Sequence, residues 1–237
     1  MLRFFSKMRY KLAAENRPAK YVRYAIGEIL LVVIGILIAL QVNNWNEERK
    51  EAAFERKVLN EIITSIGQNI NYLKRGIDSN NDAINSCQII LNYFDKNLPY
   101  SDSLDRHFSV SLQWFYPSIQ NNAYESLKSS GLHLIKNDSI RDKLGGIYEW
   151  KYMEILNQRQ EDYFYGIVAP VLAELFESYE FRGPMKPYNY DELKESNKYK
   201  HIIRTLKSNR ELQNQYWEMS INSRLDLAKM IEQELNK

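Results

Sequence analysis

The sequence has few of the residues that interrupt helices. Its 237 residues include nine Gly, six Pro and a single Cys. Long stretches without Gly or Pro argue against a β architecture with many turns, and a lone cysteine excludes an intrachain disulfide. We therefore expect an all-α fold without a disulfide framework. Because Cys87 lies in an apolar run, we predict a small buried core residue and not a reactive thiol.

The residue patterns that carry catalysis or metal binding are also missing from the sequence. His107, His133 and His201 are scattered, and none has a partner at metal-ligand spacing. There is no glycine-rich phosphate loop, no HExxH motif and no recognisable pairing of a nucleophile with a base. We therefore predict that the protein is not an enzyme and that it uses no metal or cofactor.

The small net charge averages two regions of opposite sign. The chain carries a formal +2, but residues 1–24 hold seven basic side chains and one acidic one, which gives +6. Without this tail and Glu28, 25 basic and 28 acidic residues remain, so the rest of the chain carries −3. A nucleic-acid-binding face would need a basic patch in that large region, so we exclude nucleic acid as a partner.

One long apolar run stands near the N-terminus. Residues 25–42 (AIGEILLVVIGILIALQV) contain a single charge, and at ~1.5 Å of rise per residue a helix of this length spans about 27 Å, close to the hydrocarbon thickness of a bilayer. Tyr21 and Tyr24 before the run and Trp45 after it suit the headgroup level, and the basic residues lie on the N-terminal side. We predict a transmembrane helix, a cytoplasmic tail over 1–24 and a periplasmic domain over 43–237.

Two alternatives concern the ends of this segment. A cleaved signal peptide is disfavoured, because the apolar run is long and residues 41–45 offer no pair of small residues for a peptidase. The tail over 1–24 is either a short amphipathic helix on the anionic inner leaflet or a basic segment that only sets orientation, with Pro18 marking the first turn of the spanning helix.

Glu28 is the ionisable residue inside the predicted span. It shares a heptad-spaced face with Gly35, where a small residue permits close approach of another helix. We interpret this face as an assembly contact in the membrane. The alternatives are that Glu28 reaches the interface or pairs with Arg23 or Lys20, or that it takes part in ion handling.

The region after the span is expected to form one helical bundle. Apolar residues at heptad spacing over 59–77 indicate a helix packed in the bundle, with a parallel oligomeric stalk as the alternative. A polar turn at 78–81 is expected to lead into a second, antiparallel helix ending near Pro99. Ser101 or Asp102 is expected to cap a third, short helix.

Further helices are expected toward the C-terminus. One should end at a left-handed Gly131, and one should begin after a cap at Asn137 and Asp138 and continue through a kink at Pro170 to about Phe181. Residues 183–187 are expected to form a loop, followed by two helices over 191–207 and 209–236.

Segments of the chain resemble an uncharacterised single-pass inner-membrane protein family of Bacteroidetes. The resemblance is carried by 24–29 (YAIGEI), 32–41 (VVIGILIALQ) and 43–47 (NNWNE), with weaker similarity at 124–131 (YESLKSSG) and 135–139 (IKNDS). It implies an inner-membrane protein with a periplasmic domain, and it implies no activity. In that lineage, Asp-Ser before an aliphatic residue can be an O-glycosylation site. Two segments fit this pattern: Asp102-Ser103-Leu104 and Asp138-Ser139-Ile140.

These observations predict a structural or accessory subunit in the bilayer, either a homo-oligomer or part of a larger envelope complex. The alternative is a ligand-sensing bundle that signals through a separate membrane partner, for which Tyr148, Trp150 and Tyr152 are the candidate pocket residues. A third hypothesis makes Glu28 part of an ion path in a larger membrane machine.

Overall fold

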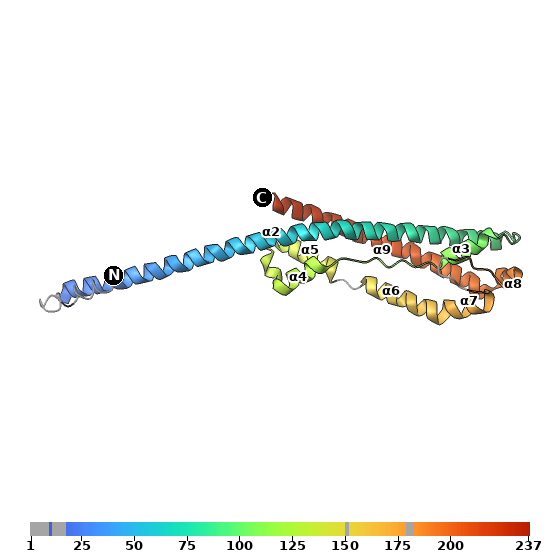
Figure 1. Ribbon diagram of the computed structural model, residues 1–237, viewed down its shortest axis with the longest axis horizontal. Coiled ribbons are helices and arrows are strands. Elements are labelled where there is room, and N and C mark those ends of the chain that lie inside the picture. Colours follow the sequence, from blue (N-terminus) through green and yellow to red (C-terminus); the bar gives the residue numbers. More distant parts are fainter. Residues whose placement is uncertain (1–9, 11–17, 150–151, 179–182) are drawn as a thin grey trace. The chain divides into compact units, whose positions relative to one another are not determined.

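A computed structural model describes residue 10 and residues 18–149, 152–178 and 183–237. Over these residues the chain is all-α, as predicted, and its extended pairing is a single antiparallel bridge between Phe176 and Pro187. The chain divides into two compact units, Met1–Glu55 and Arg56–Lys237. The first helix, α2 (Pro18–Asp95), contributes residues to both units (Figure 1).

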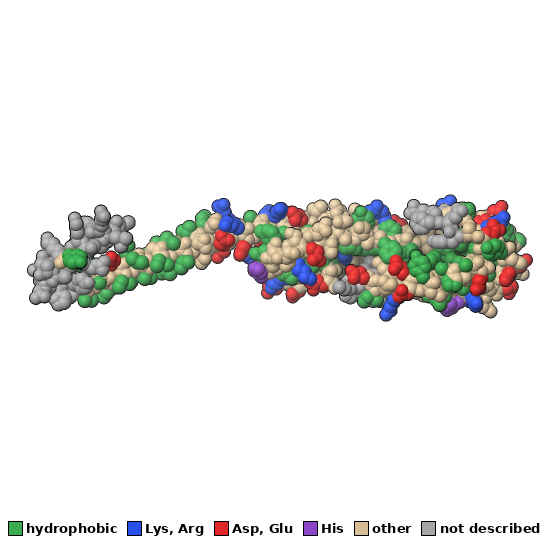
Figure 2. Space-filling view, turned by 60° about the horizontal axis from the view of Figure 1, so that its bottom comes forward, with side chains coloured by type: hydrophobic (Ala, Val, Ile, Leu, Met, Phe, Trp, Pro, Cys, Tyr) green, Lys and Arg blue, Asp and Glu red, His purple; other side chains and the backbone are tan. Residues whose placement is uncertain are grey.

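In the first unit, α2 contains a long apolar stretch that is not buried in the protein. None of its most apolar eighteen-residue window is buried. Figure 2 shows mostly apolar side chains along this segment. By length and composition, this helix is able to cross a membrane.

In the second unit, α2 lies antiparallel to α9 (Asn197–Leu235), as Figure 1 shows. Three contacts show that the two helices run in opposite directions. Arg56 bonds the carbonyl of Leu235 at 3.0 Å, Asn80 bonds Gln213 at 3.0 Å, and Asp95 pairs with Arg204 at 3.8 Å. Residue numbers rise on one helix while they fall on the other.

Shorter helices cover this pair. In chain order they are α3 (Ser103–Ser111), α4 (Asn122–Ser130), a 3₁₀ turn (Leu132–Leu134), α5 (Asp138–Tyr148), α6 (Tyr152–Tyr163), a π-helical turn (Phe164–Val168), α7 (Ala169–Leu175) and α8 (Tyr190–Glu195). In Figure 1, α6 and α7 lie beside α9, while α4 and α5 lie near the start of the second unit.

An aromatic cluster closes the core between α2, α3, α7 and α9. The ring of Phe108 meets that of Phe176 at 5.3 Å, and Tyr199 lies 5.4 Å from Phe176. All three side chains are buried, together with Cys87, whose burial was predicted. Such tilted ring contacts stabilise a core beyond the area that they bury.

The predicted turn at 78–81 is wrong. α2 continues through these residues, and the antiparallel partner of its second half is α9, which is distant in sequence. The segment contains neither Gly nor Pro, and two of its polar side chains form hydrogen bonds across the helix pair. Asn80 donates to Gln213 and to Asn214, at 3.0 and 2.9 Å, and Asn214 donates to Asn81 at 2.9 Å.

The two helices predicted over 191–207 and 209–236 also differ from the observed helices. α9 is a single helix through 208, and Asn209 and Arg210 lie within it. Ser196 caps its start by accepting a hydrogen bond from the amide of Tyr199. The predicted helix from Ser139 is divided. α5 ends at Tyr148. The helix that begins at Tyr152 widens into the π-helical turn directly before Pro170, which lies at the start of α7 and has no N–H for the helical ladder.

Several predicted helix ends are confirmed. α4 ends at Gly131, which has φ of 113°, and Asn137 caps α5 by accepting from the amide of Ile140 at 3.3 Å. At the start of α3 the hydroxyl of Ser101, not the carboxylate of Asp102, accepts the amide of Ser103. The predicted helix end near Phe181 is wrong, because α7 ends at Leu175 and Phe176 is extended. The amphipathic helix predicted over 1–24 falls on residues that lie largely outside the described part.

Two glycines in α2 give a matched test of this packing. A Cβ at Gly76 would lie 2.5 Å from Cζ3 of the buried Trp217, whereas a Cβ at Gly67 would meet no atom within 4 Å. We expect Gly76→Ala to lower the free energy of unfolding by about 1–3 kcal/mol through overpacking. Gly67→Ala should leave it unchanged or raise it by up to ~1 kcal/mol through helix propensity. Urea titrations followed by circular dichroism measure both, and equal effects would contradict the packing of Trp217 on Gly76.

Candidate functional site

The exposed apolar part of α2 is the first candidate site. A Cβ at Gly35 would meet no atom within 4 Å, so no part of the described chain fills the space beside this residue. The large aliphatic side chains around it are about half exposed, as in an isolated helix. The face that the sequence assigned to assembly is therefore open to lipid or to another helix.

The structure places the other predicted residues of this segment on the same helix. Arg23 is exposed and Glu28 is half-buried. Tyr24 and Trp45 are exposed at 50% and 62%. They stand 21 residues apart, which places them about 31 Å apart along a helix axis, a spacing that suits the two boundaries of a bilayer. The side chain of Tyr21 lies outside the described part.

The histidines of the second unit lie on separate elements. His107 on α3 contacts the hydroxyl of Ser86 at 3.1 Å, and burial together with nearby Arg106 lowers its pKa. His133 lies in the 3₁₀ turn and His201 on α9. Across the described ranges, no group of three His, Cys, Asp or Glu residues is placed to hold a metal ion.

Of the residues proposed for a ligand pocket, Tyr148 is described by the structure, and its ring packs on another ring. The ring of Tyr148 stacks on that of Tyr124 at 4.8 Å with 9° between the planes. The hydroxyl of Tyr124 donates to Glu149 at 3.0 Å, and Lys128 pairs with the same carboxylate at 2.7 Å. Lys128 and Tyr124 together lower the pKa of Glu149. Trp150 and the side chain of Tyr152 lie outside the described residues.

Two buried arginines were not foreseen from the sequence. Arg210 is 1% exposed and Arg224 is 5% exposed, and burial lowers the pKa of both. Arg210 donates to the carbonyls of Leu206 and Gln113, at 3.0 and 2.9 Å, which ties the segment after α3 to α9. The two arginines share a heptad spacing with Trp217 and Ile231, and this spacing is the sequence pattern that indicates their burial. Charged residues are normally assigned to the surface.

The two candidate glycosylation motifs stand at helix starts. Ser103 begins α3 and Ser139 is the second residue of α5, and both serines are exposed. Their surroundings are those of helix caps, so modification at either serine stays a prediction.

No family model matches the chain, and no curated protein or solved structure matches it significantly. The resemblance carried by the membrane segment therefore also stays a prediction.

The state of Cys87 is directly testable. Its side chain is fully buried, and burial raises the pKa of its thiol to about 11. We expect iodoacetamide to alkylate the native chain at mildly alkaline pH at least on the order of a hundredfold more slowly than the denatured chain, because both thiolate and access are reduced. Mass spectrometry of quenched samples measures the two rates, and rapid labelling of the folded protein would contradict a core role.

Proposed function

We propose that this chain is a membrane-anchored, non-catalytic structural or accessory subunit. Residues 25–42 cross the inner membrane, 1–24 stay in the cytoplasm, and 43–237 form a periplasmic helical domain that mediates assembly with other proteins. The observation that carries the proposal is the complete exposure of the apolar window of α2. Each large aliphatic side chain gains about 1.5–3 kcal/mol when it leaves water, so this segment requires lipid or protein around it.

The charge distribution supports the orientation. The basic excess lies before the apolar segment, and Lys and Arg accumulate on the cytoplasmic side of membrane helices. Tyr24 and Trp45 are exposed near the two ends of the span, where aromatic rings favour the interface. The family resemblance implies the same arrangement.

The face around Gly35 supports assembly within the membrane. Glu28 stands seven residues before Gly35, which brings the two within about 20° on a helix. A glycine permits close approach of two helix backbones, and a polar side chain on the same face is able to bond across the contact, for about 0.6–2 kcal/mol. A neighbouring copy, or a helix of a partner protein, fits this combination better than lipid tails do.

Cysteine crosslinking tests this face. In a Cys87→Ala background, Gly35→Cys should form a disulfide-linked dimer in oxidised membranes. Leu37→Cys, about 200° around the same helix, should give several-fold less. Non-reducing gel electrophoresis measures the ratio. Equal crosslinking at both positions would show that collision, and not a defined face, produces the dimer.

The same membranes, extracted in mild detergent, separate self-assembly from partnership. A chain that stays monomeric and brings no other protein with it would refute the assembly role. A partner recovered without self-crosslinking would assign the Gly35 face to a heteromeric contact.

The orientation has its own test. In the Cys87→Ala background, Asp102→Cys places a thiol in the exposed start of α3, and Ser6→Cys places one in the basic tail. We expect a membrane-impermeant maleimide to label Asp102→Cys, and not Ser6→Cys, in intact cells with a permeabilised outer membrane. Lysed cells serve as the control, since both positions should then react. Labelling of Ser6→Cys in intact cells would reverse the orientation.

A further inference from the structure

A groove on the second unit is lined by aromatic side chains and one carboxylate. Its cavity of about 170 Å³ lies between the segment that follows α3 and the junction of α6 with the π-helical turn. Four aromatic residues form most of the walls, and Leu112 and Leu206 add apolar area. The aromatic residues are Trp114, Tyr116, Phe164 and Tyr165.

The four rings come as two pairs from opposite walls. Trp114 and Tyr116 lie 5.7 Å apart with 59° between their planes, and Phe164 and Tyr165 lie 5.3 Å apart at 87°. Tilted rings present both faces and edges, so the walls together offer π faces in several directions. Phe164 and Tyr165 are consecutive residues at the start of the π-helical turn. The helix is wider at this turn, and the two adjacent side chains line the same cavity.

The charge of the groove is negative. Glu161 lines it one turn before Tyr165, and its carboxylate accepts a hydrogen bond from the hydroxyl of Tyr116 at 2.9 Å. No Lys, Arg or His is among the described residues that line this cavity. Arg159 belongs to an adjoining cavity of about 200 Å³, which shares Trp114 and Gln160 with the groove.

The hydroxyl group of Tyr116 stays protonated and donates its hydrogen bond to Glu161. Burial, with the hydrogen bond to Glu161, raises the pKa of Tyr116 to about 12. Tyr116 is therefore neutral at physiological pH and holds the acidic side chain at the edge of the groove without adding charge.

The wall of the groove that follows α3 is fixed in place. Arg210 is buried and donates to the carbonyl of Gln113, which fixes the chain beside Trp114 to α9. The next residue, Phe115, meets Trp217 at 6.3 Å, edge to face. A wall held on both sides loses little conformational freedom when a ligand enters.

We propose that this groove binds the ammonium group of a small organic cation between the aromatic faces of Trp114, Tyr116, Phe164 and Tyr165 and the carboxylate of Glu161. Aromatic faces and a carboxylate are the chemistry that attracts a quaternary or alkylated ammonium ion. A metal ion would require several oxygen or nitrogen ligands, and a neutral apolar ligand would gain nothing from the charge of the carboxylate. This inference does not depend on the assembly role.

Choline is the probe, and its neutral isostere 3,3-dimethyl-1-butanol is the matched control. The full chain is held in a non-ionic detergent, so that no lipid headgroup supplies an ammonium group. Calorimetric titration should show saturable choline binding and at least roughly tenfold weaker binding of the isostere, because the cation–π and carboxylate contacts require the charge. Adding phosphatidylcholine then distinguishes the source of the cation. If the lipid competes with choline, the natural ligand is a lipid headgroup; if it does not compete, the natural ligand is a soluble cation.

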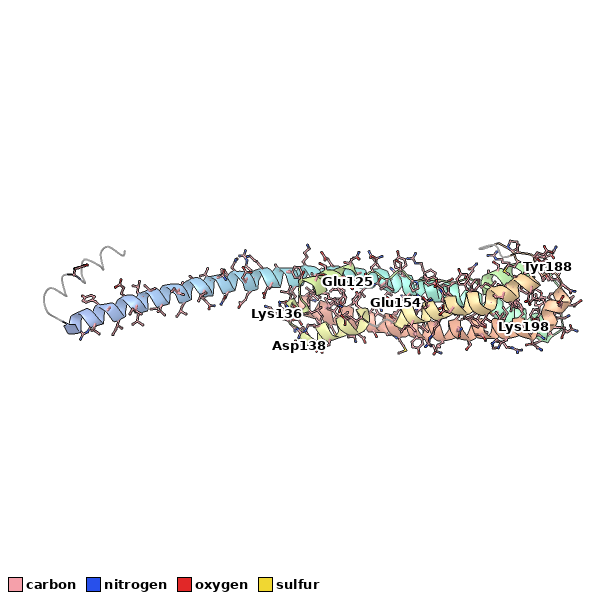
Figure 3. The ribbon with its side chains drawn as sticks, turned by 90° about the horizontal axis from the view of Figure 1, so that it is seen from below. Glu125, Lys136, Asp138, Glu154, Tyr188 and Lys198 are labelled. Carbon is pink, nitrogen blue, oxygen red and sulfur yellow. The ribbon has the colours of Figure 1, made fainter. Side chains whose placement is uncertain are left out.

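Two pairs of variants locate the binding. Glu161→Gln keeps an acceptor for Tyr116 but removes the charge, and we expect roughly tenfold weaker choline binding. Glu154→Gln removes the same charge from an exposed position on α6 that does not line the groove, and should leave affinity unchanged (Figure 3). Tyr165 is 72% exposed, so its replacement leaves the core intact. Tyr165→Leu should weaken binding severalfold, while Tyr165→Phe, which keeps the π face, should not.

Circular dichroism spectra and melting curves confirm that each variant is folded before titration. Absence of choline binding at tens of millimolar would overturn the proposal, as would equal affinity for the neutral isostere. Wild-type affinity in both Glu161→Gln and Tyr165→Leu would also overturn it, because binding would then lie elsewhere on the chain.

Discussion

The contact between α2 and α9 sets the register of the second unit. At its centre, Asn80 and Asn81 exchange hydrogen bonds with Gln213 and Asn214, and Asn80 and Gln213 are buried. A one-turn slip would leave these amides buried without partners, at about 1–3 kcal/mol for each unsatisfied group. Apolar contacts alone would allow one helix to shift along the other. These hydrogen-bonded amides therefore determine a single alignment of the two long helices.

The remaining elements depend on that alignment. Arg210 lies three residues before Gln213 on α9, and its guanidinium reaches the carbonyl of Gln113 only when α9 has the observed register. The same alignment places Trp217 against Gly76 and Phe115. The segment between α3 and α4 is therefore positioned by α9, and through it the aromatic wall of the groove is set opposite α6.

Among the described residues, the apolar segment of the first unit and the aromatic groove of the second unit are surfaces that differ in chemistry. The first unit presents an apolar helix with Gly35 and Glu28 on one face, which suits lipid and a neighbouring helix. The second unit presents a small groove that combines π faces with the carboxylate of Glu161. The proposed assembly in the membrane and the proposed recognition of an organic cation are compatible, because they use separate residues.

The sequence by itself determined the features that depend on local pattern. The apolar span, the all-helical character, the glycine end of α4, the Asn137 cap and the burial of Cys87 follow from composition, periodicity and cap chemistry within a few residues. Tertiary structure alone decided which helices pair. A polar segment such as 78–81 predicts a turn when read locally, but α9 supplies partners for Asn80 and Asn81 from more than a hundred residues away. The groove depends on tertiary structure for the same reason, because its two walls are brought together only by the packing of the segment after α3 and of α6 against α9.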